Sequence, residues 1–547
     1  MNVTSLETFS LVAPEIVLVL AALVAYLGGA FAGLRFGWLV ATAGIVAAMS
    51  VTRGQAADAA FSAGIAIDPF STYIRWTVLA LGLLLCLVQS GDLFAAAVSR
   101  GPGLHRGGTC EEAGTFLLLL AGLSLVGVAG DLVLLFAGLE LVSIPTYILL
   151  GLKRTDARGQ EASLKYFFLS LVASAIFLYA LVCLYGIGGS TDLGAIAARL
   201  KAESTGRTAQ ALLPLAIGLG VVGAAFRLAA VPMHFYAPDV YEGTSPGNAA
   251  LLSTLPKVAG IVVLARLLAV VGPAASPDLL WRIVVVLAAV TMTVGNVMAL
   301  WQSNLRRLLA CSSIAHAGYL LVGISAAAAP SISPRLLTTG GLAATLFYLA
   351  TYAIATIGVF GAIAYLGHRW PEWTSGSGPR PPREEITLVD DLDGLSGTNP
   401  VAAFAIAVFL LSLAGIPPLP GFWGKLALAI SALEVDGTAA IELGSRRAWF
   451  VGLAVLLVLN AAIAAAYYLR IIAAMYFKTT KRGVQADGGL SAGVAMLVCL
   501  VLVGLVTIRP RNLLSAASRA GESLVPHAAA PSAGVPETTH TIMAASR

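Results

Sequence analysis

Charged and titratable side chains lie inside long apolar segments of this sequence. The stretch Gly223–Lys257 contains Arg227, Pro232, His234 and Lys257 between two apolar runs. A Lys or Arg at the centre of a membrane helix costs about 2.5–3.5 kcal/mol on insertion scales, so a role for such residues is the default hypothesis. Proline cannot donate to the helical ladder. We therefore expect a broken helix at Pro232, with a path for ions beside it.

A second interruption follows the same pattern later in the chain. Pro417, Pro418 and Pro420 lie inside an otherwise apolar run, and Lys425 follows them. Paired interruptions in two halves of a membrane protein are typical of transporter repeats whose sites lie at the breaks. The breaks fall in the seventh and twelfth apolar runs, five runs apart. This spacing predicts two five-helix units, related by inversion.

Glu140 and Lys257 are the first candidates for proton transfer. They lie near the middle of the fifth and the eighth apolar run. Burial disfavours the charged form of either group and a neighbouring opposite charge favours it, so a moving carboxylate could make Lys257 release and regain a proton. The alternatives are a neutral Glu140 in a structural hydrogen bond and a Lys257 whose ammonium extends to the membrane surface.

Five further residues complete the candidate set. Lys425 could take up or release the proton on the far side of the path. Lys165 lies a turn or so into the sixth run, where an interfacial anchor is nearly as plausible as a functional group. Arg227 can hold a carboxylate but cannot relay a proton, because guanidinium keeps its proton. His234 and His316 titrate near neutral pH and could bridge water chains or simply pack in the core.

The composition indicates a polytopic membrane protein. Of 547 residues, 58% are hydrophobic and 11% are charged, against about 25% charged in soluble domains. The net charge of +5 is small for this length and argues against a nucleic-acid-binding surface. The distribution of Lys and Arg among the loops favours both termini on the outer side of the membrane.

Redox chemistry within the chain is not expected. The five cysteines are scattered without a CxxC pair, so the close spacing of an iron–sulfur or zinc site is missing. Gly218, Gly220 and Gly223 match GxGxxG, but they lie inside an apolar run without a preceding strand, which argues against dinucleotide binding. We expect no cofactor and no metal in this chain.

Apolar runs long enough to cross a bilayer predict an all-α fold with about fourteen transmembrane helices, the seventh and twelfth discontinuous. The first run lacks a basic leader and is read as a retained helix. The predicted runs cover residues 13–33, 35–51, 72–95, 114–130, 132–151, 164–188, 211–231, 246–270, 280–301, 305–325, 341–366, 401–433, 449–475 and 490–508.

These runs divide the chain into regions. The expected division is a three-helix region at 1–112, five-helix units at 113–270 and 280–480, a last helix at 490–508 and a disordered tail at 509–547. A polar loop at 368–400, rich in Pro, Gly and Ser, interrupts the second unit.

Several of these stretches resemble one protein family. LELVSIPTYILLGLKR, VPMHFYAPDVYEG, LWQSNLRRLLACSSIAHAGYLLVGI and FLLSLAGIPPLPGFWGK are similar to the antiporter-like membrane subunits of proton-pumping NADH:quinone oxidoreductase (respiratory complex I), subunit N in particular. The resemblance covers most of residues 130–480. It implies fourteen helices, a hydrophilic axis along the membrane midplane, and a multi-pass protein of the bacterial inner membrane.

The resemblance also implies functional residues and partners. The family's proton-path residues fall on Glu140, Lys165, Lys257 and Lys425, and its lysine of the seventh helix falls on Arg227, which puts proton exchange there in doubt. In such a complex, electrons pass from NADH through flavin and iron–sulfur clusters of other subunits to a quinone. This chain would bind none of these groups and would contact other membrane-arm subunits and lipid while it translocates protons.

Two other functions remain open. One is an antiporter-like subunit of a related assembly, such as a cation/proton antiporter, a membrane hydrogenase or the photosynthetic relative. The other is a structural spacer of the membrane arm whose charges serve assembly, and Arg227 is the residue that favours it.

Overall fold

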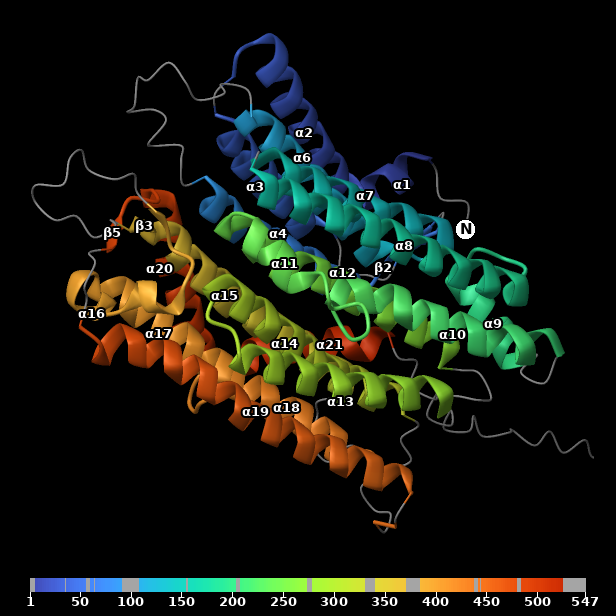
Figure 1. The fold of residues 1–547 in the computed structure, drawn as a ribbon. Helices are drawn as coiled ribbons and strands as arrows, with labels where there is room; N and C mark the ends of the chain where they lie inside the picture. Colours follow the sequence, from blue (N-terminus) through green and yellow to red (C-terminus); the bar gives the residue numbers. More distant parts are fainter. Residues whose placement is uncertain are drawn as a thin grey trace, which may run out of the picture.

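The computed structural model describes most of the chain. The described residues are 5–34, 36–55, 60–62, 64–90, 108–153, 156–202, 207–272, 278–329, 340–369, 384–436, 441–442, 444–479 and 484–524. Within them the chain is almost entirely helical, and the helices run roughly side by side, with the N-terminal half along one side and the C-terminal half along the other (Figure 1).

Each of the fourteen predicted runs overlaps a helix, although residues 91–95 of the third run lie outside the described part and α10 ends at Leu228, before the end of the seventh run. Twelve helices in the described residues are long and apolar enough to span a membrane. The other two predicted spans are α3 (Gly37–Gly54) and the broken pair α17 (Pro400–Ala414) and α18 (Pro420–Leu433). The twelve are α2 (Ala13–Phe31), α4 (Pro69–Gln89), α6 (Gly108–Val128), α7 (Leu132–Lys153), α8 (Ala157–Gly188), α10 (Arg207–Leu228), α12 (Pro246–Val271), α13 (Asp278–Leu300), α14 (Leu305–Ala328), α15 (Gly341–Leu366), α19 (Arg446–Phe477) and α20 (Leu490–Ile508).

Short elements connect or flank these helices. They are α1 (Ser5–Leu11), α9 (Leu193–Ala202), α11 (Ala237–Gly243), α16 (Leu395–Thr398), α21 (Pro510–Leu524), the 3₁₀ helix η1 (Val389–Leu392), and strands β1 (Ala60–Ser62), β2 (Ile65–Ile67), β3 (Gly367–Arg369), β4 (Glu384–Glu385) and β5 (Val484–Ala486). Strand β1 pairs antiparallel with β2, and the order β4-β3-β5 forms a second small antiparallel sheet in which His368 lies opposite Glu385 and Gln485.

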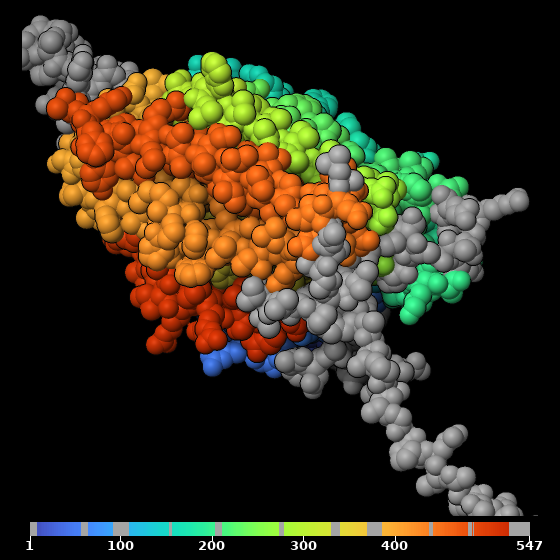
Figure 2. Space-filling model, turned by 90° about the horizontal axis from the view of Figure 1, so that it is seen from below, coloured from blue at the N-terminus to red at the C-terminus, as the bar shows by residue number. Residues whose placement is uncertain are grey.

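The centre of the molecule is formed by α12, α14 and α15. The most apolar 18-residue window is 94% buried in α12, fully buried in α14 and 94% buried in α15. The corresponding windows of α2, α19 and α20 are 28–33% buried, so these helices present apolar side chains outward, as contact with lipid requires. Figure 2 shows such an outer face, formed mainly by the C-terminal segments in orange and red.

Local sequence signals explain where the central helices begin. Ser245 accepts a hydrogen bond from the Asn248 amide, and Pro246 follows at the first helical position of α12. Asn304 accepts from the Arg306 and Arg307 amides at the start of α14. Such side-chain caps satisfy amides that have no partner within the helix.

Both predicted helix breaks are present. Helix α10 ends at Leu228, Ala229 has a φ of +55°, and the chain turns until α11 begins at Ala237. Helix α17 ends at Ala414, Gly415 has a φ of +86°, and α18 begins at Pro420. Each break leaves backbone carbonyl groups without helical partners at the C-terminal end of a half-helix.

A buried ion pair that the sequence reading did not predict holds the N-terminal helices together. Arg75 of α4 donates to both carboxylate oxygens of Glu15 of α2, at 2.9 and 2.8 Å. Ser124 of α6 donates to the same carboxylate at 2.5 Å, and Arg75 also donates to Gln55 at 2.9 Å. Full hydrogen bonding makes this pair tolerable in an apolar surrounding.

The prediction of a disordered tail from residue 509 is wrong for Pro510–Leu524. These residues form α21, which packs on α4 and α15, and the Ser523 hydroxyl accepts a 3.2 Å hydrogen bond from the Phe70 amide. The Ala- and Ser-rich composition concealed an amphipathic helix whose buried positions are Ala517, Ala520, Gly521 and Leu524. Residues 525–547 lie outside the described part.

The predicted polar loop 368–400 is partly ordered by contacts with α19 and β5. Lys478, just after α19, donates to Asp390 at 2.8 Å and pairs with Asp393 at 3.3 Å. The hydrogen bond to Asp390 is the main cause that raises the pKa of the Lys478 ammonium. Residues 370–383 lie outside the described part, and the division into two five-helix units stays a prediction.

Candidate functional site

Lys257 lies at the first helix break. Its side chain projects from α12 and is 1% exposed. The ammonium donates to the Leu228 carbonyl oxygen at 2.7 Å and to the Ser313 carbonyl oxygen at 2.8 Å. Leu228 is the last residue of α10, so Lys257 binds a carbonyl group that the break has freed. The partial negative charge at a helix C-terminus favours a cation at this position.

Lys425 occupies the matching place at the second break. Its side chain projects from α18 and is 5% exposed. The ammonium donates to the carbonyl oxygens of Leu413 and Ala414, both at 2.9 Å, which end α17. It also lies 4.7 Å from the ring centroid of Tyr319, within the range of a cation–π contact. In the described residues, neither Lys425 nor Lys257 has a carboxylate oxygen within 4.0 Å.

Arg227 joins Glu140 to the first break. Its guanidinium is 3.9 Å from Glu140 Oε1 and donates to the Ser143 hydroxyl at 2.8 Å. The Ser174 hydroxyl donates to the same Glu140 oxygen at 2.5 Å. Arg227 is 7% exposed, whereas the Glu140 side chain is 29% exposed. Because Arg227 immediately precedes Leu228, the ion pair adjoins the carbonyl group that holds Lys257.

Polar side chains of α14 lie between the two lysines. The Ser313 hydroxyl is 2.9 Å from the Tyr352 hydroxyl and 3.4 Å from that of Tyr241. One turn further, His316 is 1% exposed, and its ring nitrogens lie 2.6 Å from the Tyr348 hydroxyl and 3.0 Å from the Tyr468 hydroxyl. A further turn brings Tyr319, whose ring faces Lys425.

The tautomer of His316 decides which ring nitrogen donates a hydrogen bond. Hydroxyl groups can both donate and accept, so the two tyrosines satisfy either tautomer. The Tyr468 hydroxyl also contacts the Ser312 hydroxyl. This segment of α14 therefore presents two groups of hydrogen-bonding side chains, one at Ser313 and one at His316, and in the described residues no hydrogen bond joins the two groups directly.

Lys165 lies in a separate ion cluster at one end of the bundle. Its ammonium is 2.7 Å from Glu161 and 2.7 Å from Asp239 of α11. Arg307 of α14 binds Asp239 at 2.7 Å and Glu242 at 2.9 Å. The Lys165 side chain is 39% exposed. The ion pairs of Lys165 in the described residues therefore do not connect it directly to Glu140, Arg227 or Lys257.

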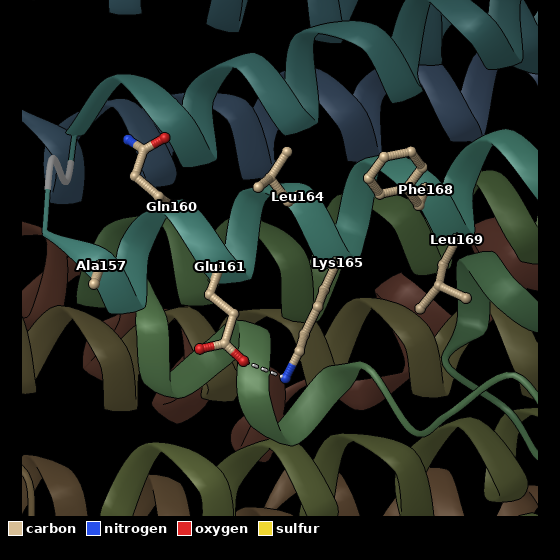
Figure 3. A pocket seen from close by; sticks show the side chains of 7 residues that line it. All are labelled: Ala157, Gln160, Glu161, Leu164, Lys165, Phe168 and Leu169. Carbon is tan, nitrogen blue, oxygen red and sulfur yellow. Dashed lines mark ion pairs between the residues drawn. The ribbon is translucent and has the colours of Figure 1, made fainter.

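A surface groove of about 640 Å³ runs along α8 beside Lys165. Figure 3 shows Glu161 and Lys165 extending to one side of the helix, while Gln160 and Leu164 extend to the other. Partly exposed ion pairs contribute little to stability. The position thus agrees with the interfacial alternative for Lys165 as well as with an entry point for protons.

His234 lies in the turn between α10 and α11 and is only partly buried. Its Nδ1 atom is buried without a hydrogen-bond partner among the described residues. The carbonyl group of His234 accepts from the Ala237 amide and so helps start α11. The structure thus places His234 at the break, as expected, but does not join it to Lys257 by a direct hydrogen bond.

Comparison with known proteins assigns the chain to a family. The family model described as "NADH:quinone oxidoreductase/Mrp antiporter, TM" matches residues 129–450. NADH-quinone oxidoreductase subunit N 1 of Sorangium cellulosum is 34% identical over 464 residues, which are 83% of each chain. The chain belongs to this family. Subunit N of Rubrobacter xylanophilus is 32% identical over 529 residues, covering 94% of this chain and 98% of that protein.

A solved structure supports the same family assignment. A chain of respiratory complex I from Thermus thermophilus with bound aureothin is 26% identical, with a TM-score of 0.71 over 92% of this chain and 99% of that chain. The resemblance noted from the sequence is thereby confirmed. Roles for the seven candidate residues within the NADH:quinone oxidoreductase/Mrp antiporter fold stay predictions.

The sequence reading missed the uncharged members of this site. Ser143 and Ser174 hold the Arg227–Glu140 pair, and four tyrosines outside α14 contact the polar groups of α14: Tyr241, Tyr348, Tyr352 and Tyr468. One signal was available: Ser313, His316 and Tyr319 recur at three-residue spacing in an apolar helix, which places them along one face. The partners on α15 and α19 have no such signal, since only the fold brings them near.

Proposed function

We propose that this chain is the proton-translocating subunit N of an NADH:quinone oxidoreductase in a bacterial inner membrane, with both termini on the outer side. The observation that carries the proposal is the placement of Lys257 and Lys425. Each is buried and bonded to carbonyl groups at a helix break. Hydrogen-bonding side chains of α14 lie between them.

In the proposed mechanism, Lys257 exchanges its proton with the chain of groups on α14. The Leu228 and Ser313 carbonyl groups stabilise its ammonium form, while burial opposes that form. A small change in the local electric field can therefore shift the equilibrium between the ammonium and the neutral amine of Lys257. The hydroxyl of Ser313 and the His316 ring then offer successive positions for the proton on its way to Lys425.

The Arg227–Glu140 pair supplies the change in field. At 3.9 Å the pair is loose, and the Glu140 carboxylate also holds Ser174. When Glu140 moves away from Arg227, the uncompensated guanidinium next to Leu228 disfavours a second cation at Lys257. When Glu140 returns, that repulsion falls. Arg227 thus acts as a fixed charge, and no proton passes through it.

Electron transfer belongs to partner subunits in this proposal. Flavin, iron–sulfur clusters and quinone would be bound elsewhere in the complex, and this chain would receive a conformational or electrostatic signal from neighbouring membrane-arm subunits. In the described residues, no group of three or more His, Cys, Asp or Glu side chains could hold a metal ion. The chain's own contribution is the buried path and its switchable charge pair.

The test is purification of the complex through an affinity tag on this chain. We expect NADH-oxidising, flavin- and iron–sulfur-containing subunits to co-purify, and the complex in sealed vesicles to couple NADH-driven quinone reduction to proton movement. The same family description includes Mrp antiporters. A complex without NADH oxidation that exchanges Na⁺ for protons would replace the proposal with a cation/proton antiporter.

A further inference from the structure

A second buried polar cluster contacts the hydroxyl of Tyr319, whose ring faces Lys425. Asn296 of α13 and Asn460 of α19 are 0% and 1% exposed. The Asn296 side-chain amide donates to the Tyr319 hydroxyl at 3.0 Å and to Asn460 Oδ1 at 3.0 Å. The Tyr467 hydroxyl donates to Asn296 Oδ1 at 3.0 Å. This amide cluster comprises Asn296, Asn460, Tyr319 and Tyr467.

The amide cluster is anchored at its other end. The Asn460 side-chain amide donates to the Thr293 hydroxyl at 3.2 Å and to the Leu456 carbonyl oxygen at 3.0 Å. Thr293 in turn donates to the Ala289 carbonyl oxygen at 2.8 Å. Each amide therefore has partners for both its donor and its acceptor atoms, and the cluster can hold one fixed arrangement.

Burying two amides in an apolar bundle costs free energy that leucines would not cost. A carboxamide neither gains nor loses a proton at usable pH, so the pair is unsuited to carrying protons. Its contact nearest Lys425 is the hydroxyl of Tyr319, whose ring lies 4.7 Å from the Lys425 ammonium. Its other partner, Tyr467, packs against Tyr468, with ring centroids 4.5 Å apart. That ring must keep its face toward Lys425 to attract the cation.

We propose that Asn296, supported by Asn460, is a positioning residue that fixes the Tyr319 ring beneath Lys425. The inference rests on the proposed function, because Lys425 is taken as the far proton site of the path. Loss of the Asn296 bond frees the ring to turn its edge toward the ammonium. The Leu413 and Ala414 carbonyl groups alone then hold Lys425, and proton exchange with His316 slows.

The alternative is a purely structural role, in which the amide cluster only holds α13, α14 and α19 together. Interhelical hydrogen bonds between Asn side chains are a common means of helix association in membranes. The two roles differ in one respect. If the cluster only joins helices, pumping should fall in step with stability, whereas a positioning role makes pumping depend on the bond to the Tyr319 hydroxyl alone.

The experiment is a double-mutant cycle on the assembled complex, with Tyr319→Phe, Asn296→Leu and both together. Proton movement per NADH oxidised and its rate are measured in vesicles, and assembly is checked by native gel. Each single variant should lower the rate about threefold to tenfold, as loss of one buried hydrogen bond allows. The double variant should be no slower than Asn296→Leu.

The thermal stability of the same complexes gives a second, independent readout. In Asn296→Leu the Tyr467 hydroxyl also loses its acceptor, so this variant should lose more stability than Tyr319→Phe. The two variants share one hydrogen bond, so the double variant should lose less stability than the sum of the two. Equal rates in the two single variants and the double variant, despite unequal losses of stability, support positioning. Fully additive rates, or normal rates in Asn296→Leu, overturn it.

Two controls keep the test decisive. Thr507→Val removes a hydroxyl that, within the described ranges, bonds the Val503 carbonyl oxygen of its own helix α20 and no other group, so this variant should pump normally. If Asn296→Leu complexes do not assemble, Asn296→Ser replaces it in the cycle, since its short hydroxyl cannot span to Tyr319 and Tyr467 together. A failure of the proposed function would already be visible in the unmodified complex, before any variant is made.

Discussion

The ammonium groups of Lys257 and Lys425 bind backbone carbonyl oxygens instead of carboxylates. Carbonyl groups are fixed dipoles without a net charge, so each lysine can be neutral or charged without stranding a buried anion. A carboxylate partner would hold the proton much more firmly. In the proposed mechanism, Glu140 therefore acts on Lys257 from a distance, across Arg227 and the Leu228 carbonyl group.

Substitutions at Arg227 test the charge pair. Arg227→Lys should keep most coupled activity, because a cation next to Glu140 is all that the mechanism requires there. Arg227→Ala should lower coupled activity about tenfold or more, since an unpaired, partly buried carboxylate favours its protonated form and no longer switches. The measurement is NADH-driven proton movement in vesicles with assembly checked separately. Equal activity in Arg227→Ala and the unmodified complex would exclude a role for the pair.

His316 offers a test of the path between the lysines. His316→Phe keeps an aromatic ring but removes both contacts with Tyr348 and Tyr468. We expect proton movement to slow about tenfold or more, as two lost hydrogen bonds of about 1 kcal/mol each imply. Phe422, an aromatic residue near the second break, can be changed to Leu as a control. Undiminished pumping by assembled His316→Phe complexes would show that protons take another route.

At the scale of elements, the sequence contained enough to place every spanning helix and both breaks. Long apolar runs identify spans because the bilayer requires satisfied backbone groups, and prolines inside such runs identify the breaks. Helix α21 was missed because alanines and serines give weak hydropathy contrast. The pairing of β3 with β5 was missed because it joins segments more than a hundred residues apart.

The second break requires glycine at position 421. A Cβ atom there would lie 1.8 Å from the Ser412 carbonyl oxygen, so Gly421→Ala must push α17 and α18 apart. Overpacking of this kind costs about 1–3 kcal/mol, and the displaced Leu413 and Ala414 carbonyl groups would no longer meet Lys425. We expect reduced assembly and a loss of pumping in what assembles.

A matched control exists on α19. A Cβ atom added at Gly452 would have no other atom of the described part of the chain within 4 Å, apart from the backbone of its own helix, so Gly452→Ala should assemble and pump normally. Native gels and vesicle assays on both variants provide the comparison. Equal behaviour of Gly421→Ala and Gly452→Ala would mean that the tight contact at the break does not matter for the site.

At the scale of the whole molecule, the class of fold and the family were predictable from the sequence. The family model that matches residues 129–450 and the relative that aligns over 529 residues confirm the family. The sequence could not predict which charged residues share a site. Position within the apolar runs already favoured Lys257 over Lys165, but only the structure shows that Lys165 lies in a partly exposed ion cluster and that Lys257 is 1% exposed. The difference in their surroundings comes from contacts between segments far apart in the chain, and the pattern of a single sequence does not reveal such contacts. The inverted relation of the two five-helix units is a prediction that superposition of an experimental structure can check.

The proposed mechanism depends above all on Lys257 as a proton carrier inside an assembled complex. Lys257→Met removes the titrating group and keeps an unbranched apolar chain of similar length, so packing around α12 should persist. The decisive measurement is NADH-driven proton movement in sealed vesicles by complexes that native gels show to be complete. We predict assembled complexes with coupled turnover lost. Normal coupled pumping by assembled Lys257→Met complexes would contradict the mechanism and favour a chain that only spaces the membrane arm.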